Sequence, residues 1–229
     1  MIYTKRGVMA AMLLGWGVFL GWMAVSNTMA RFLGPRTYWV AWFGTAALLL
    51  SGAITALQAT RAPGPRAGRA DWAGVVLLSL PIALVIALPT PQLGAQAASR
   101  KAVGVGVLSA FAPPPTRGEE IGLEEIHYAS LSREYADQVG IVEGADVDLV
   151  GFVTHPKNMK QGTFSLTRFY ISCCAADAVP YSVAIAADED LSDDTWMNIR
   201  GSLVRGTDGF LVEPTQLEEI EEPSSPYLY

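Results

Sequence analysis

The sequence predicts an α-helical membrane segment of about three transmembrane helices, followed by a small all-β, OB-like barrel domain with one preceding helix. Two observations lead to this fold class. Residues 1–99 hold seven basic residues and one acidic residue, a net charge of +6, whereas residues 100–229 hold 9 basic and 21 acidic residues, a net charge of −12. Apolar residues form continuous runs in the first part and alternate with a period of two in much of the second. The composition of the first part is therefore typical of a membrane-spanning segment, and that of the second part is typical of a water-soluble domain.

Three apolar runs without a charged residue make up the membrane segment: Val8–Val25, Tyr38–Leu57 and Trp72–Leu88. Each reaches the ~17 to 25 residues that a helix needs to cross a bilayer, and none has a polar face. We expect a transmembrane region over residues 1–92, with spans near 8–25, 38–57 and 72–90. A cleaved signal peptide is the alternative for the first run, but two further runs follow it.

Basic residues at the ends of the runs predict the orientation. One side holds five of them, Lys5, Arg6, Arg61, Arg66 and Arg69. The other side holds four, Arg31, Arg36, Arg100 and Lys101. Because loops rich in Lys and Arg stay in the cytoplasm, we expect a multi-pass plasma-membrane protein with a cytoplasmic N-terminus and an extracytoplasmic C-terminal domain.

The second part divides into a linker, a domain and a tail. Residues 93–118 are rich in Ala, Gly, Pro and Ser, which predicts a linker with at most a short strand at 103–111. Glu119–Val139 reads as a helix that Gly140 ends. The extracytoplasmic β-rich domain is expected over 119–212. The acidic, Pro/Ser-rich residues 213–229 predict a disordered tail.

Alternation of apolar and polar residues predicts four strands, near Val147–Val153, Tyr181–Ile185, Met197–Leu203 and Phe210–Val212. A further strand carries Phe164 and Leu166 on one parity and Phe169 and Ile171 on the other. A strand with one buried face cannot change parity without an extra residue. We therefore expect a β-bulge near Thr167.

One segment resembles a known family. Residues 167–180, Thr-Arg-Phe-Tyr-Ile-Ser-Cys-Cys-Ala-Ala-Asp-Ala-Val-Pro, resemble the signature of the YcgQ-type bacterial membrane proteins, described as permease subunits. The likeness extends to Val150–Val153, to Trp196 with Gly201, and to the hydrophobic N-terminal half. The resemblance implies a plasma-membrane protein paired with a separate polytopic permease of the YcgR or YraQ type. Many members carry a His-rich loop that suggests metal ions, whereas the corresponding loop here, Gln58–Asp71, has no His.

Cys173 and Cys174 are the only cysteines, and three interpretations of them stay open. They are a buried pair of small side chains at a strand end, a strained vicinal disulfide, or metal ligands acting with Asp177. Thiolates favour zinc or copper(I), so zinc or copper is the candidate cofactor. Adjacent side chains on a strand point to opposite faces, so joint ligation requires a turn at this point. Asp177 is equally suited to capping that turn.

Neither histidine fits the same site. His155 lies before the start of the strand that ends at Cys173. At a rise of ~3.3 Å per residue, the two ends of this strand are roughly 30 Å apart. His127 is expected on the solvent face of its helix. The acidic run at residues 188–194 lacks the spacing of a calcium loop and predicts a solvated turn.

The sequence contains no nucleophile elbow, phosphate loop or zinc-protease pair, so we predict that the protein is not an enzyme. The charge of −12 beyond residue 99 argues against nucleic-acid binding, which needs Lys and Arg. We expect an accessory subunit of a membrane permease, with the β domain at the mouth of the transporter. Its partners would be the polytopic permease and the lipid bilayer. The alternative is a free-standing extracytoplasmic metal or redox sensor.

Overall fold

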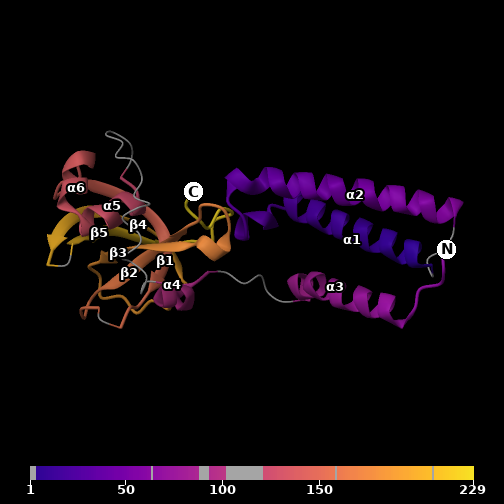
Figure 1. Ribbon diagram of the computed structural model, residues 1–229. Helices are drawn as coiled ribbons and strands as arrows, with labels where there is room; N and C mark the ends of the chain where they lie inside the picture. Colours follow the sequence, from indigo (N-terminus) through magenta and orange to yellow (C-terminus); the bar gives the residue numbers. More distant parts are fainter. Residues whose placement is uncertain (1–3, 63, 88–92, 102–120, 158, 208) are drawn as a thin grey trace. The chain divides into compact units, whose positions relative to one another are not determined.

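The computed structural model of the protein describes residues 4–62, 64–87, 93–101, 121–157, 159–207 and 209–229. The chain divides into two compact units, Met1–Gln92 and Leu93–Tyr229, the first helical and the second built around a β-barrel (Figure 1). The predicted strand at 103–111, most of the predicted linker and the first two residues of the predicted helix lie outside the described residues.

The helical unit contains three long helices, α1 (Lys5–Val25), α2 (Tyr38–Arg61) and α3 (Arg69–Ala87). Two 3₁₀ turns, η1 (Thr28–Arg31) and η2 (Pro35–Thr37), connect α1 to α2. By length and composition all three helices are long and apolar enough to cross a membrane, as predicted, and the unit is compatible with membrane insertion.

α1 and α2 pack side by side through small residues (Figure 1). A Cβ atom on Gly17 would lie 2.7 Å from the side chain of Leu49, and one on Gly52 would lie 2.8 Å from the side chain of Leu14. Each glycine thus accepts a leucine from the opposite helix. Small residues allow this close approach of two backbones, which is the usual way helices associate in a bilayer.

Much of the apolar surface of the helical unit faces outward. Val18, Trp39 and Leu77 are each at least 60% exposed, and no residue of α3 is buried among those described. Surfaces of this kind are unfavourable in water but suit the hydrocarbon of a bilayer.

The N-terminus and the connection between α2 and α3 meet at one end of this unit. A guanidinium nitrogen of Arg6, Nη1, donates to the carbonyl oxygen of Ala62 over 2.7 Å, and Thr4 pairs with Arg66 in a β-bridge. Lys5 lies 3.7 Å from the carboxylate of Asp71. The five basic residues on which the predicted orientation rests therefore gather at the same end.

The second unit is a closed barrel of five strands, and three short helices precede it among the residues that the structure describes. The helices are α4 (Ala95–Lys101), α5 (Leu123–Leu131) and α6 (Arg133–Val139). The strands are β1 (Asp146–Thr154), β2 (Phe164–Tyr170), β3 (Val179–Ile185), β4 (Trp196–Gly206) and β5 (Gly209–Glu219). They close in the order β1-β2-β3-β5-β4, in which only the β3–β5 pair is parallel. The predicted OB-like barrel is confirmed.

The barrel core consists of the alternating apolar positions that the sequence marks, together with α5, which packs against β3 and β5. Its largest fully buried side chains from the strands include Leu149, Phe164, Leu166, Tyr181, Ile185, Ile199 and Leu203. The alternation of apolar and polar residues in these strands therefore predicted correctly which side chains face inward.

The expected β-bulge near Thr167 is wrong. β2 pairs with β3 in unbroken register from Phe164 to Tyr170. Phe164 belongs to the barrel core, whereas Phe169 and Ile171 belong to a second apolar cluster with Ala95 and Ala98 of α4. Both faces of β2 are thus covered, so the change of parity needs no extra residue. The register shift that the structure does contain lies between Arg200 and Gly201, where β4 pairs with β5.

The single helix predicted at Glu119–Val139 is two helices, because Ser132 adopts an extended conformation and caps α6. Its hydroxyl accepts a hydrogen bond from the backbone amide of Tyr135 over 3.3 Å. Serine at such a position competes with continuation of the helix. Tyr135 still reaches the core, but Leu131, at the end of α5, is 57% exposed. Gly140 ends α6 with a φ of 83°, as predicted.

The disordered tail predicted for residues 213–229 is also wrong. β5 extends to Glu219, and Tyr227 is only 4% exposed, packed in the second apolar cluster. The backbone of Leu228 exchanges hydrogen bonds of 3.0 and 2.8 Å with Ile171 and Phe169. Arg168 donates to the carbonyl oxygen of Ser225 over 2.6 Å. The buried side chain of Tyr227 and the backbone of Leu228 thus anchor a segment whose composition alone suggests disorder.

Candidate metal centre

The turn between β2 and β3 carries both cysteines. β2 ends at Tyr170, and a single 3₁₀ turn, η4 (Ala175–Asp177), leads into β3. Burial of Ile171 on one side and Ala178 on the other anchors the turn to the second apolar cluster. The residues between them project into solvent, with Cys173 exposed and Cys174 half-buried. The interpretation of a buried cysteine pair is therefore wrong for Cys173.

Asp177 organises this turn through its carboxylate. One oxygen, Oδ2, accepts from the backbone amides of Cys173 at 2.7 Å and Cys174 at 3.4 Å, and Oδ1 accepts from the amide of Ser172 at 3.1 Å. Partial burial opposes ionisation, but the hydrogen bonds from the Cys173 side chain and from these amides outweigh it, so the pKa of Asp177 is below its usual value. The capping role that the sequence suggested for Asp177 is present.

The two thiols lie beside this carboxylate. The sulfur atoms of Cys173 and Cys174 are 3.7 Å apart, and no disulfide joins them. The hydrogen bond of Cys173 with Asp177, followed by that with Cys174, raises the pKa of the Cys173 thiol to about 11. In the absence of a metal this thiol therefore keeps its proton at neutral pH.

These three residues form the only group of three or more potential metal ligands that the structure shows among the residues it describes. One ligand atom of each, two sulfurs and a carboxylate oxygen, can be chosen so that all lie within 4.8 Å of one another. The turn that joint ligation requires is present at the predicted place. Two soft thiolates with a carboxylate suit zinc or copper(I).

Lys101 is a part of this centre that the sequence analysis did not identify. Its ammonium nitrogen, Nζ, donates to the carbonyl oxygens of Ala175, Ala176 and Ala178 at 3.4, 3.2 and 2.9 Å. It thereby connects the C-terminal end of α4 to the turn that carries the candidate ligands. The sequence showed only that Lys101 lies within the predicted linker, because the contact joins residues more than 70 positions apart.

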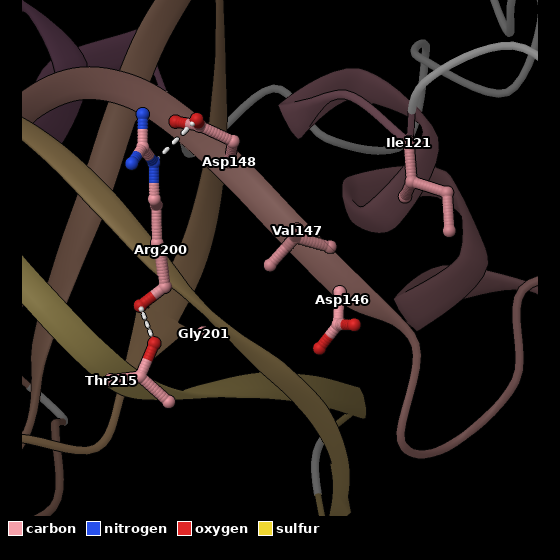
Figure 2. Close-up of a pocket in the computed structure, with 7 residues that line it drawn as sticks. All are labelled: Ile121, Asp146, Val147, Asp148, Arg200, Gly201 and Thr215. Atoms are coloured by element: carbon pink, nitrogen blue, oxygen red, sulfur yellow. Dashed lines mark hydrogen bonds and ion pairs between the residues drawn. The ribbon is translucent and has the colours of Figure 1, made fainter.

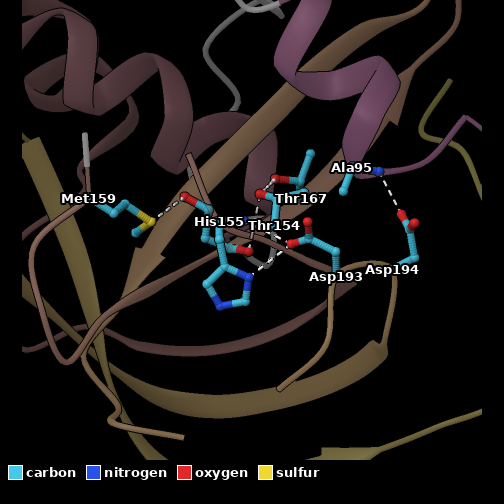
Figure 3. Close-up of polar contacts among 8 residues, drawn as sticks. Ala95, Thr154, His155, Met159, Thr167, Asp193 and Asp194 are labelled. Atoms are coloured by element: carbon cyan, nitrogen blue, oxygen red, sulfur yellow. Dashed lines mark hydrogen bonds and ion pairs between the residues drawn. The ribbon is translucent and has the colours of Figure 1, made fainter. Parts of the chain in front are cut away.

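His155 and two residues of the acidic run, Asp193 and Asp194, do not belong to this group of potential metal ligands; Figure 3 shows their polar contacts. Asp193 accepts hydrogen bonds from the backbone amide of His155 at 3.1 Å and from its ring nitrogen Nδ1 at 2.8 Å. Asp194 accepts from the backbone amide of Ala95 at 2.5 Å, at the start of α4. These two carboxylates accept hydrogen bonds from protein groups, a role that the prediction of a solvated turn did not include.

His127 does not face solvent, contrary to the prediction. The backbone amide of Ser182 donates to its Nδ1 over 3.2 Å, and its ring lies 5.3 Å from that of Tyr181. Burial is the main cause that lowers its pKa, so the ring is neutral. The spacing of Ile126, Ala129 and Tyr128 in the helix could have indicated this, because His127 borders the same buried face.

Glu124 lies one turn before His127 and has a strongly shifted pKa. Burial, then repulsion from Glu125, raises the pKa of Glu124 to about 7, while Arg168 lowers it. This group is a titratable feature of the barrel and is separate from the cysteine turn.

A second surface feature is an open pocket of about 420 Å³ on β1, β4 and β5. Figure 2 shows Arg200 reaching Asp148, at 2.8 Å, while the hydroxyl of Thr215 donates to the backbone oxygen of Arg200 at 3.2 Å. Both charged side chains are more than half exposed, so the ion pair contributes little stability.

Comparison with known proteins bears on the barrel rather than on the helical unit. The family model described as the DUF1980 C-terminal domain matches residues 109–229, which include every strand and the cysteine turn. No curated protein matches the chain. Because the match covers more than half of the sequence and the whole of the barrel, the chain belongs to the DUF1980 family.

Proposed function

We propose that this protein is an accessory subunit of a bacterial plasma-membrane permease. Its helical unit lies in the bilayer beside the transporter, and its barrel domain, on the outer face, handles a metal ion. The resemblance of residues 167–180 to the YcgQ-type proteins supports the permease partner. The observation that carries the metal role is the group formed by Cys173, Cys174 and Asp177, with ligand atoms within 4.8 Å on a turn that solvent can reach.

The proposed orientation rests on charge. The basic residues at the N-terminus and in the connection between α2 and α3 occupy one end of the helical unit, where contacts such as Arg6 to Ala62 hold them together. A cluster of this kind favours the cytoplasmic side. With three spans, the barrel domain then emerges on the opposite side of the membrane.

Exposed apolar helix faces support docking on a partner within the bilayer. Every residue of α3 that the structure describes is at least partly exposed, and the close contacts of Gly17 and Gly52 join α1 to α2. Helix association in membranes relies on such shape-complementary packing. α3 is therefore available for contact with a polytopic permease.

Co-purification tests the subunit role. The full chain would be expressed at its native level, extracted in mild detergent and isolated through an affinity tag. We expect a polytopic permease to be recovered in stoichiometric amount. The variant with Cys173→Ser and Cys174→Ser is a matched control, because the altered turn belongs to the barrel and should leave helix docking intact. Recovery of the protein alone would contradict the subunit role and favour a free-standing metal or redox sensor.

A further inference from the structure

The distance between the two sulfur atoms distinguishes between coordination geometries. Bonds of ~2.3 Å from zinc at the tetrahedral angle place two thiolate sulfurs about 3.8 Å apart, whereas a linear site with bonds of that length places them about 4.6 Å apart. The observed separation of Cys173 and Cys174 is 3.7 Å. The turn therefore already holds the thiols at a spacing suited to a tetrahedral ion.

Asp177 supplies a third ligand without losing its structural role. Its carboxylate accepts three backbone hydrogen bonds, all from the segment that carries the two thiols. A carboxylate has about four lone-pair positions, and the one that accepts from the Cys173 thiol becomes available to a cation when that thiol loses its proton. Because these amides and the two sulfurs belong to the same short segment, the hydrogen bonds keep the carboxylate beside the thiols.

Lys101 is not a ligand, but it holds the turn that carries the ligands. Its ammonium group engages the carbonyl oxygens of Ala175, Ala176 and Ala178, so these atoms are already used as acceptors. Two thiolates, one carboxylate and a divalent ion carry a net charge of −1, which a nearby ammonium offsets. Among the described residues, no further His, Cys, Asp or Glu belongs to the group.

We propose that Cys173, Cys174 and Asp177 bind zinc tetrahedrally, that the fourth position is open to an external ligand, and that Lys101 is the positioning residue of this site. The inference rests on the proposed metal-handling function and names its ion and geometry. On binding, each thiol loses its proton, two Zn–S bonds form and two protons pass to solvent. Closed four-ligand sites are typical of structural zinc, whereas an open position allows exchange. The fourth position is therefore where a donor group of another molecule binds the zinc.

Cobalt(II) replacement tests the geometry. The reduced full chain in detergent micelles would be titrated with cobalt(II) and followed by absorption, with zinc added afterwards as competitor. We expect one equivalent to produce the intense visible bands of tetrahedral cobalt and sulfur-to-cobalt charge transfer, and zinc to abolish both. Imidazole should shift the visible bands, since it can occupy the open position. Cys173→Ser and Cys174→Ser should each weaken or remove the charge-transfer band.

The zinc affinities of Lys101 variants test the role of this residue. We expect Lys101→Met to weaken zinc binding by roughly 10- to 100-fold, the usual effect of removing a group that positions metal ligands, and Lys101→Arg to restore most of it. Lys160→Met is the matched control, because Lys160 bonds to Thr207 and not to this turn. Unchanged zinc affinity in Lys101→Met would contradict the positioning role.

Other outcomes separate this inference from the proposed function. Octahedral cobalt without charge transfer, or a tetrahedral spectrum that imidazole leaves unchanged, would overturn the open zinc site. If the wild-type chain bound copper(I) but neither zinc nor cobalt, the zinc inference would fail while a metal-handling subunit would stand. Binding of none of these metals would overturn both the zinc site and the metal role.

Discussion

The hydroxyl groups of Tyr128 on α5 and Tyr181 on β3 lie 3.0 Å apart inside the barrel domain. Both side chains are at most 4% exposed, and the rings of His127 and Tyr170 pack against that of Tyr181. This contact joins the helix to the sheet at a buried position, where the low dielectric strengthens a hydrogen bond.

The tyrosine pair should therefore show coupling in a double-mutant cycle. Tyr181→Phe and Tyr128→Phe each remove this hydrogen bond and leave a buried hydroxyl with one partner fewer, so each should cost about 1 to 2 kcal/mol. The loss of stability in the double variant should be smaller, by about 1 kcal/mol, than the sum of the losses in the two single variants. Amide hydrogen exchange of peptides from β3 in the full chain would measure this. Tyr170→Phe is the control, and strict additivity would show that the pair is not coupled.

Glu124 should make stability depend on pH. Its pKa is about 7 in the folded protein against an ordinary value of 4.5, so between these values the folded state keeps a proton that the unfolded state has lost. Stability should be highest below this window and fall as pH rises through it. Glu124→Gln should remove this fall. Thermal unfolding of the barrel in the full chain, recorded from about pH 5 to pH 8, would measure it.

Glu143→Gln, at an exposed position, should retain the wild-type dependence on pH. Buried His127 acts in the opposite sense, because its lowered pKa costs stability as pH falls. A decline of stability with rising pH that persisted in Glu124→Gln would therefore have to come from another group.

The C-terminal segment should detach when Tyr227 is truncated. Tyr227 is 4% exposed in the second apolar cluster. Removing a buried aromatic side chain costs about 3 kcal/mol or more, so Tyr227→Ala should release the residues beyond β5 while the barrel stays folded. Limited proteolysis of the full chain, read by mass spectrometry, would detect early cleavage after Glu219. Glu221→Ala, at an exposed site, should leave the cleavage rate unchanged, and resistance of Tyr227→Ala would contradict the packing.

The orientation can be tested with the native cysteines, since the chain has no others. A membrane-impermeant maleimide added to intact spheroplasts should label Cys173, which is exposed on the barrel. The control introduces Ala62→Cys, between α2 and α3, into the variant without cysteines, and this thiol should react only after permeabilisation. The reverse pattern would place the barrel in the cytoplasm.

The sequence predicted the elements whose signal is local. Charge-free runs long enough to span a bilayer identified α1, α2 and α3, and period-two alternation identified the inward residues of β1, β3 and β4. The adjacent cysteines and the nearby Asp177 indicated the candidate site correctly, because the turn that holds them is formed by residues that are neighbours in the chain.

Long-range packing accounts for what the sequence analysis missed. The parity change in β2 looked like a bulge because nothing local showed that α4 and Tyr227 cover its outer face. Composition suggested disorder after Val212, yet a buried tyrosine and backbone pairing with β2 order this segment. His127 and Lys101 likewise acquire their roles from partners more than 50 residues away.

The sequence by itself determined the division into a helical membrane segment and an acidic barrel, and it placed two thiols beside a carboxylate, because hydropathy, periodicity and spacing are properties of neighbouring residues. Only the tertiary structure decided that the sulfurs lie 3.7 Å apart, that Lys101 holds their turn and that the last residues close over β2. The first depends on the conformation of the turn that Asp177 holds, and the other two depend on tertiary packing, which brings distant segments together in a way that no local pattern encodes.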